Sequence, residues 1–317
     1  MHSALSLIFV STLLAFSMAC PRTTLAEAIQ ISGPEGPLEA EMITVEGAKN
    51  VVVIIPGSGP TNRDGNTPHA GLASNMYKML AQTLADHGIA SLRIDKRGMF
   101  ASSAALANSN AVTVGDYAED ARNWVRRAAE VAPCVWIAGH SEGGLVAMVA
   151  AQSPPQSLCG LILIATAGRP IGQVLLEQMR AMQDAQTLMP QIEAAVAEIE
   201  AGRRFDTSKL AEPLQRMFAE SVQPYMIDLF AHDPAAIATS WRGPVLIVQG
   251  DADIQVKLVD AGILAKAMPQ AKHIVLENMT HVMKTGVPGK PFATYIDPDY
   301  PLHSELASVI SDFIIYN

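Results

Sequence analysis

Short apolar runs alternate with longer segments of helical period along most of this chain. The runs are rich in β-branched residues, whereas the segments between them place apolar residues three and four positions apart. We therefore predict strands at residues 50–55, 89–94, 135–139, 160–165, 244–249 and 273–277. Strands and helices in this alternation form crossover units, so the pattern predicts an α/β fold with a doubly wound, mostly parallel sheet.

Two earlier runs, residues 29–32 and 39–46, alternate more clearly between polar and apolar positions. Such alternation is typical of strands that bury one face only. We expect these runs to form an antiparallel hairpin at one edge, which makes the sheet eight-stranded.

Two helices carry clear boundary signals. Apolar residues from Met76 to Leu84 recur at helical spacing and stop at Gly88, which suits a left-handed cap. A second helix opens with Thr113 and has Asp116 three positions later, as in a capping box. Its predicted buried residues are Tyr117, Ala121, Trp124 and Ala128.

The alternation breaks between Ala165 and Val245. A structureless loop of that length is improbable in a compact domain, so we expect an inserted unit. Its apolar stretches have helical character, which predicts a helical cap at residues 166–242. The cap would interrupt a core formed by residues 29–165 and 243–317.

Several methionines lie in this insertion, at positions 179, 182, 189, 217 and 226. Methionines at such spacings usually pack helices together, and we favour that interpretation. The alternative is that some of them line an adaptable apolar pocket for an acyl group beneath the cap.

An apolar run at residues 5–16 is followed by polar residues and then by Ala26 and Ala28. This order is typical of a secretory signal peptide, so we expect residues 1–28 to be removed by cleavage near one of these alanines. The leading segment departs from the usual pattern, because it contains His2 but neither Lys nor Arg. We expect the mature protein to be periplasmic or secreted.

The N-terminus allows two other interpretations. An uncleaved anchor would need roughly 20 apolar residues to cross a membrane, and this run is shorter. Cys20 could carry a lipid, but Ser17 occupies the position where lipoprotein signals usually place Leu. We therefore expect no stable membrane span in the mature chain.

Cys134 and Cys159 each lie just before or within a strand-like apolar run. If these strands are parallel neighbours, the two cysteines lie about one strand spacing apart, within the range that a disulfide tolerates. Export would permit the bridge. Two reduced, buried cysteines are the alternative, and the sequence leaves both open.

The composition bounds the function. Hydrophobic residues make up 49% and charged residues 17% of the 317 residues, which predicts one large buried core. The net charge of −9 argues against binding nucleic acid, because phosphates would be repelled. We expect a small-molecule substrate that is neutral or cationic.

The strongest candidate chemistry lies at Gly139-His140-Ser141-Glu142-Gly143. This G-x-S-x-G run follows a predicted strand and precedes a predicted helix. A turn this tight strains the serine backbone, and only residues without side chains at 139 and 143 let the chain pass closely. The turn would expose the Ser141 hydroxyl as a nucleophile.

A serine hydroxyl is a poor nucleophile unless a base takes its proton, and the base needs an orienting acid. After such a turn the acid and then the histidine follow in the chain. We assign His281 as the base, because it follows the last strand. His273 lies inside that strand, and His303 opens the C-terminal helix, where it would cap the helix or face solvent.

The acid is expected after the strand at 244–249, where Asp251 and Asp253 are both within reach. We favour Asp253, because Gly250 allows the chain to turn before it presents this carboxylate. Asp251 would instead stabilise the turn.

The oxyanion of an acyl-transfer reaction needs two backbone N–H donors. Glu142 follows the nucleophile and provides one, and Ser58 in the loop after the first parallel strand is our choice for the other. The glycine-rich run around Ser58 lacks the lysine spacing of a phosphate-binding loop. We expect the Glu142 side chain to pair with Arg97, the alternative being attraction of a cationic substrate group.

Together these motifs resemble the α/β-hydrolase superfamily over nearly the whole mature chain. The residues that carry the resemblance are 56–59, 95–98, 139–144, 250–253 and 280–281. Residues 57–66 and 139–144 are similar to those of capped bacterial carboxylesterases near the serine aminopeptidase-like hydrolases. The resemblance implies hydrolysis of short-chain carboxylic esters through an acyl-enzyme, without cofactor or metal. Pro56 departs from relatives that carry histidine there.

Other functions use the same residues. An exported aminopeptidase would need an acidic group for the substrate amine, and Glu142, Glu177 or Glu220 could supply it. Thioester or lactone hydrolysis would need no further group. A ligand-binding module that lacks activity is the remote alternative, and it usually shows a damaged triad.

Overall fold

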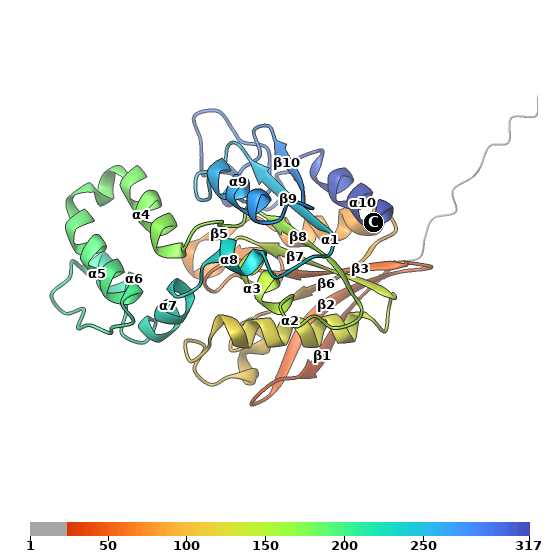
Figure 1. Ribbon diagram of the computed structural model, residues 1–317, viewed down its shortest axis with the longest axis horizontal. Coiled ribbons are helices and arrows are strands. Elements are labelled where there is room, and N and C mark those ends of the chain that lie inside the picture. Colours follow the sequence, from red (N-terminus) through yellow and green to blue (C-terminus); the bar gives the residue numbers. More distant parts are fainter. Residues whose placement is uncertain (1–23) are drawn as a thin grey trace, which may run out of the picture.

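The computed structural model describes residues 24–317, and its centre is an eight-stranded sheet (Figure 1). The strand order is β1-β2-β6-β3-β7-β8-β9-β10. The strands are β1 (Thr24–Ser32), β2 (Pro37–Val45), β3 (Asn50–Ile55), β6 (Ala90–Ile94), β7 (Cys134–His140), β8 (Leu158–Ile164), β9 (Val245–Gly250) and β10 (Lys272–Leu276). From β6 to β10 all neighbours are parallel, whereas β1 and β2 form an antiparallel hairpin at the edge. Both sequence expectations are confirmed.

Helices cover both faces of the sheet. The core helices are α1 (Met76–Asp86), α2 (Val114–Ala128), α3 (Glu142–Ala150), α8 (Pro234–Ala238), α9 (Leu258–Ala267) and α10 (Leu306–Tyr316). Helices α1 and α10 pack on one face, and α2, α3 and α9 pack on the other. Alternate residues of β3 point to the two faces, so Val51 joins the α2 side and Val52 joins the α1 side.

The local signals in the sequence correspond to observed features. Helix α1 ends two residues before Gly88, whose φ is 78°. At the start of α2, Thr113 and Asp116 form a capping box through reciprocal bonds between side chain and backbone. Its four predicted inward residues are all buried. The sequence did not predict a small ribbon formed by β4 (Asn66–Thr67) and β5 (Leu72–Ala73).

A helical lobe lies between β8 and β9 in the chain, to the left of the sheet in Figure 1. It contains α4 (Ile171–Ala181), α5 (Met189–Glu200), α6 (Glu212–Met217) and α7 (Gln223–Phe230). We call this lobe the cap. The 3₁₀ segments are η1 (Pro68–Ala70), η2 (Phe100–Ala105) and η4 (Ala293–Tyr295) in the core, and η3 (Gln183–Leu188) between α4 and α5 in the cap.

A disulfide joins Cys134 to Cys159, with the two Cα atoms 5.6 Å apart. It links β7 to β8, which are parallel neighbours, near the ends at which both strands begin. Since β7 ends at His140, the disulfide lies at the opposite end of the strands from the G-x-S-x-G turn.

The N-terminal prediction falls mainly on residues 1–23, outside the described part of the chain. The described chain begins with β1, so cleavage after Ala26 or Ala28 would shorten this edge strand. Residues 24–28 are exposed, whereas Ile29 is buried, so the shortened strand would keep its first core residue. Within residues 24–317, no helix combines the length and the apolar composition needed to cross a membrane.

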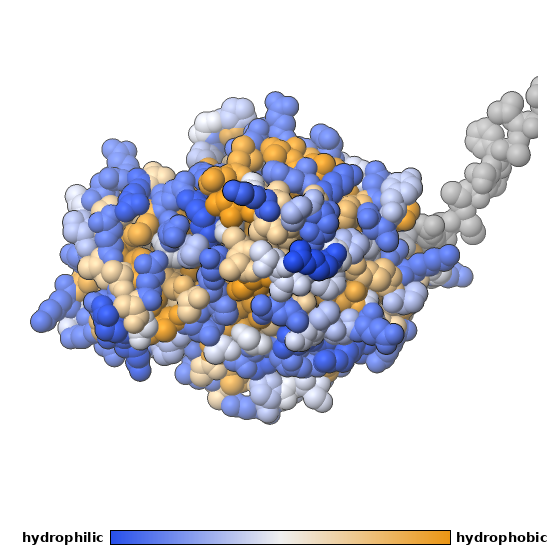
Figure 2. Space-filling view, in the orientation of Figure 1, coloured by the Kyte–Doolittle hydropathy of each residue, from blue (hydrophilic) through white to orange (hydrophobic). Residues whose placement is uncertain are grey.

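The surface visible in Figure 2 is mostly polar, as expected from the composition. Leu258 and Val259, at the start of α9, are exposed.

Candidate active site

Ser141 lies at the sharp turn between β7 and α3. Its φ and ψ are 54° and −121°, a strained conformation for a residue with a side chain. A Cβ at Gly139 would lie 2.3 Å from the Gly143 carbonyl oxygen, and one at Gly143 would lie 2.4 Å from the Ile55 carbonyl oxygen. The close passage at both glycines is therefore observed, and the strand, turn and helix are those that the motif predicts.

His281 and Asp253 meet beneath the same cavity that Ser141 lines. The Nδ1 atom of His281 lies 2.8 Å from Oδ2 of Asp253, and both residues are buried. Asp253 Oδ1 also accepts bonds from the amides of Gln255 and Val256. Burial alone would raise the pKa of Asp253, but the neighbouring His281 and these hydrogen bonds hold it below its ordinary value.

The other candidate residues lie elsewhere. Asp251 accepts a bond from the Asn278 amide, so it ties together the two loops that carry Asp253 and His281. His273 is exposed on β10. Of the two alternatives for His303, the solvent-facing one is wrong, because the residue is buried and its Nε2 donates to the Glu277 carbonyl oxygen at 3.0 Å. Its own carbonyl oxygen accepts from the Leu306 amide at the start of α10, which fits the capping alternative.

Ser58 and Glu142, which the sequence predicts as oxyanion donors, line the same cavity as Ser141. Ser58 follows β3 in the loop facing the turn, and Glu142 is the first residue of α3. Among residues 24–317, neither amide donates to a protein acceptor. The N-terminus of α3 also directs its positive dipole end toward this cavity.

Sequence reasoning missed a hydrogen-bond chain that runs through His140 and Tyr77. Nε2 of His140 lies 2.8 Å from the His281 carbonyl oxygen, so it must donate. Nδ1 then accepts from the Tyr77 hydroxyl at 2.8 Å, and that hydroxyl accepts from the Gly57 amide at 3.0 Å. Burial holds the pKa of His140 at about 3 and raises that of Tyr77, so both groups are neutral.

This chain ties the loop of Ser58 to the backbone of His281. The G-x-S-x-G motif does not indicate this hydrogen-bond chain, because His140 occupies one of its variable positions. The available sequence signal was a histidine at the end of a strand in which all other predicted residues are apolar or glycine.

The expectation that Glu142 pairs with Arg97 is wrong. Arg97 instead binds Asp116 and Asp120 on α2. The Glu142 carboxylate lies 3.5 Å from the Lys96 ammonium, and both side chains are almost completely buried. Consecutive residues of an extended loop project in different directions, so Lys96 and Arg97 serve different partners.

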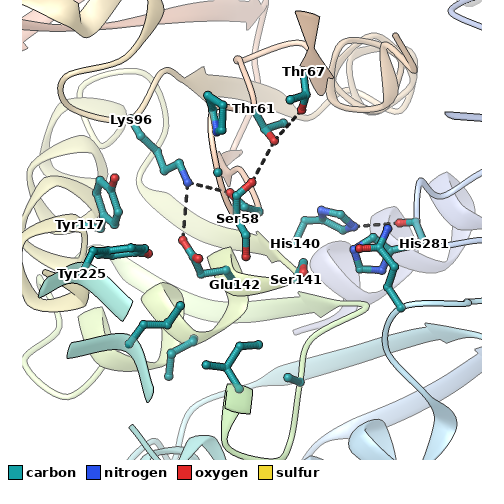
Figure 3. Close-up of a pocket in the computed structure, with 18 of the residues that line it drawn as sticks. Ser58, Thr61, Thr67, Lys96, Tyr117, His140, Ser141, Glu142, Tyr225 and His281 are labelled. Atoms are coloured by element: carbon teal, nitrogen blue, oxygen red, sulfur yellow. Dashed lines mark hydrogen bonds and ion pairs between the residues drawn. The ribbon is translucent and has the colours of Figure 1, made fainter. Parts of the chain in front are cut away.

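A cavity of about 1020 Å³ lies between the cap and the carboxyl ends of the strands. We call its polar side, formed by Gly57, Ser58, His140, Ser141 and His281, the core wall (Figure 3). We call the opposite side, formed by Ile171, Val174, Leu175, Met226 and Leu229, the cap wall.

The cap methionines divide between the two proposed roles. Met217 and Met226 line the cavity, as the pocket interpretation requires. Met189 is buried among the cap helices, Met179 is partly buried there, and Met182 is 50% exposed. Within the described chain, no three His, Cys, Asp or Glu side chains are grouped so that they could hold a metal ion.

Comparisons with known proteins agree with this architecture. Esterase EstD of Thermotoga maritima is 27% identical over 241 residues, which are 74% of this chain and 55% of that protein. The chain thus spans about half the length of this relative. Among solved structures, Est1E from Butyrivibrio proteoclasticus has a TM-score of 0.57 at 18% identity, covering 91% of this chain and 98% of Est1E.

A thermophilic esterase from Thermogutta terrifontis has a TM-score of 0.56 at 16% identity, covering 92% of this chain and 99% of the esterase. At such identities the likeness establishes the fold. Residues 70–284 match the model of the serine aminopeptidase family S33. With this match over most of its length, the chain belongs to the serine aminopeptidase family S33 of the α/β-hydrolase superfamily.

Proposed function

We propose that this protein hydrolyses carboxylic esters through an acyl-enzyme on Ser141. The observation that carries the proposal is the core wall. It presents a serine in a strained turn, a histidine bound to a buried aspartate, and two backbone amides without protein acceptors. These are the groups that acyl transfer requires.

In the proposed cycle, Ser141 Oγ attacks the ester carbonyl while His281 Nε2 takes the hydroxyl proton. Asp253 holds the imidazole by Nδ1 and stabilises the imidazolium that forms. The amides of Ser58 and Glu142 bind the oxyanion. His281 then protonates the leaving alcohol, and it later activates the water that releases the acid.

The composition of the cap wall favours the proposal of an uncharged, apolar substrate. Its side chains are aliphatic or methionine, and they would pack against an acyl chain. Because the cavity has to hold both the acid and the alcohol parts, we propose short-chain esters. The name of the Thermotoga maritima relative, an esterase, is in keeping with this chemistry.

The distribution of acidic groups favours an ester over an aminoacyl substrate. Glu142 is the single acidic side chain among the described residues that line the cavity, and Lys96 neutralises it. Glu177 binds Arg169, and neither Glu177 nor Glu220 lines the cavity. A substrate ammonium would therefore find no free counterion there. Thioesters and lactones remain alternative substrates for the same groups.

We also propose that the protein is exported. The disulfide supports this proposal, because such bonds form and persist mainly in oxidising compartments. Fractionation of cells producing the full chain, with N-terminal sequencing of the product, tests it. Recovery of an uncut chain in the cytoplasm would contradict export.

The proposed activity is tested with Ser141→Ala. The wild-type protein should be labelled by a fluorophosphonate and should hydrolyse p-nitrophenyl acetate and butyrate faster than aminoacyl p-nitroanilides. The variant should lose labelling and ester turnover while it keeps the same melting temperature. Wild-type turnover by the variant would reject Ser141, and faster anilide cleavage by the wild-type would favour an aminopeptidase.

A further inference from the structure

Lys96 lies next to the proposed oxyanion site, yet it has no part in the catalytic cycle described above. We propose that Lys96 is a positioning residue, which orients and polarises the Gly57–Ser58 peptide so that the Ser58 amide binds the oxyanion. This proposal rests on the proposed ester hydrolysis.

The first observation is a hydrogen bond to the backbone. Lys96 Nζ donates to the Gly57 carbonyl oxygen at 2.7 Å, in a buried environment (Figure 3). This carbonyl belongs to the same planar peptide group as the Ser58 N–H. In a trans peptide the C=O and N–H bonds point in opposite directions, so a bond that fixes one fixes the other.

The ammonium also affects the strength of the donor. A cation on the carbonyl oxygen draws electron density from the amide nitrogen, which makes its N–H a better donor. This polarisation is stronger in a site of low dielectric constant than in water. Lys96 would therefore increase the attraction of the Ser58 amide for a developing negative charge.

The rest of the loop is held by other groups. The Gly57 amide donates to Tyr77, and the Ser58 carbonyl accepts from the Thr61 hydroxyl at 3.1 Å. The peptide groups on either side of Gly57–Ser58 are thus fixed independently. Lys96 is the protein group that controls the peptide between them.

The second observation is the pairing of Lys96 with Glu142. Glu142 carries the other proposed oxyanion N–H, so one ammonium contacts both donor residues. Within the described chain, both carboxylate oxygens of Glu142 are buried and lack hydrogen bonds. A buried ion pair with such incomplete bonding contributes little to stability, which leaves its geometry as the feature to explain.

The experiment compares Glu142→Gln with the double variant Lys96→Met/Glu142→Gln. Glu142→Gln keeps the backbone N–H and the Lys96 bond to Gly57. The double variant removes that bond without leaving an unpaired carboxylate. Any difference between the two reports on Lys96.

We expect kcat for p-nitrophenyl butyrate to be roughly 10- to 100-fold lower in the double variant than in Glu142→Gln, since complete loss of an oxyanion donor costs about 10²- to 10³-fold. KM should change less than threefold. The inhibition constant of phenylboronic acid, which forms a tetrahedral adduct with the serine, should rise by a factor similar to the loss in kcat. The melting temperature of Glu142→Gln should be the lower of the two, because this variant leaves the buried Lys96 ammonium without a counterion.

A third variant, Lys96→Gln/Glu142→Gln, retains a donor that can reach toward Gly57 and should recover part of the rate. It also replaces the methionine variant if that protein does not fold. Equal kcat and equal boronate inhibition in Glu142→Gln and both double variants would overturn the role of Lys96. Absence of ester turnover and of Ser141 labelling in the wild-type protein would instead overturn the proposed function.

Discussion

The core wall and the cap wall of the cavity are held in different ways. On the core wall, hydrogen bonds run without a break from Gly57 through Tyr77 and His140 to His281. The cap wall consists of apolar side chains that pack without directional bonds. Under the proposed ester hydrolysis, the core wall would fix the position of the reacting atoms, whereas the cap wall would fix the shape of the space that the substrate enters.

The contacts between the cap and the core follow the same division. Polar links lie at the margins of the cap, where Arg169 binds Asp260 and where Asp228 accepts a bond from the Val114 amide. These bonds place the cap over the cavity, and Arg169 also lines it. Substitutions in the core wall should therefore change rates, and substitutions in the cap wall should change substrate preference.

The largest effect is expected for Asp253→Asn. An asparagine cannot hold the His281 tautomer as a carboxylate does, so kcat should fall by about 10⁴-fold with the fold intact. Steady-state ester hydrolysis measures the loss. Asp251→Asn is the matched control, because Asp251 binds a backbone amide and should leave kcat within about tenfold of wild type. A reversed ranking of the two would reassign the acid.

Removal of the disulfide tests whether the free energy of unfolding can change while the catalytic rate that depends on the core wall stays the same. Replacing both Cys134 and Cys159 with Ser releases a constraint on the unfolded chain over a separation of 25 residues. The free energy of unfolding should fall by about 3 kcal/mol, as measured by urea denaturation. Ester turnover at 25 °C should be unchanged, because the bridge lies at the far end of β7 and β8. A parallel loss of kcat would show that the two are coupled.

The neutral His140 in the core wall predicts a pH dependence of stability. Its pKa in the folded state, about 3, lies below the ordinary value of 6.5. Between these two pH values the unfolded chain binds a proton at His140 and the folded protein does not. Its contribution is complete above pH 6.5 and is lost as the pH falls toward 3. Between pH 7 and 5 the loss should be about 2 kcal/mol.

His140→Asn removes this group, so urea denaturation of the variant should show a correspondingly smaller loss between pH 7 and 5. The comparison uses the change with pH in each protein and is independent of the variant's absolute stability. Identical changes in both proteins would mean that folding does not lower the pKa of His140.

The smallest effect is expected in the cap wall. Met226→Ala enlarges the cavity and should shift the ratio of kcat/KM values toward longer acyl chains, by roughly 3- to 10-fold between butyrate and octanoate esters. Met182→Ala is the control, because Met182 is 50% exposed and outside the cavity lining. An equal shift of the kcat/KM ratio in both variants would show that the cap wall does not set the preference for acyl chain length.

Much of the fold could be predicted from periodicity, because the central strands β3, β6, β7, β8 and β9 bury nearly all their residues and α2 begins with a capping box. Residues 50–55 coincide with β3, and the Thr113 capping box is observed where its spacing indicated. The β4–β5 ribbon was missed, because two-residue strands have no measurable period.

For the candidate site, residue order and loop position sufficed to choose Asp253 and His281, which the structure brings into contact. The partner of Glu142 could not be chosen in this way. Lys96 and Arg97 are adjacent and equally charged, and the direction of each side chain depends on loop geometry that a sequence does not encode locally. The role of Tyr77 could not be predicted for a similar reason, since its hydroxyl bonds to His140, which lies 63 residues away in the sequence.

The insertion point of the cap has a consequence for its exchange. The cap leaves the core after β8 and returns before β9, and these two strands are hydrogen-bonded neighbours. Because the two strands are parallel, the segment starts at the carboxyl end of β8 and must return to the opposite edge of the sheet, where β9 begins. Lengthening or exchanging the segment costs little closure entropy, because that cost grows only with the logarithm of its length. The segment that forms the cap wall is therefore one continuous piece of chain, which can be exchanged without altering the residues of the core wall.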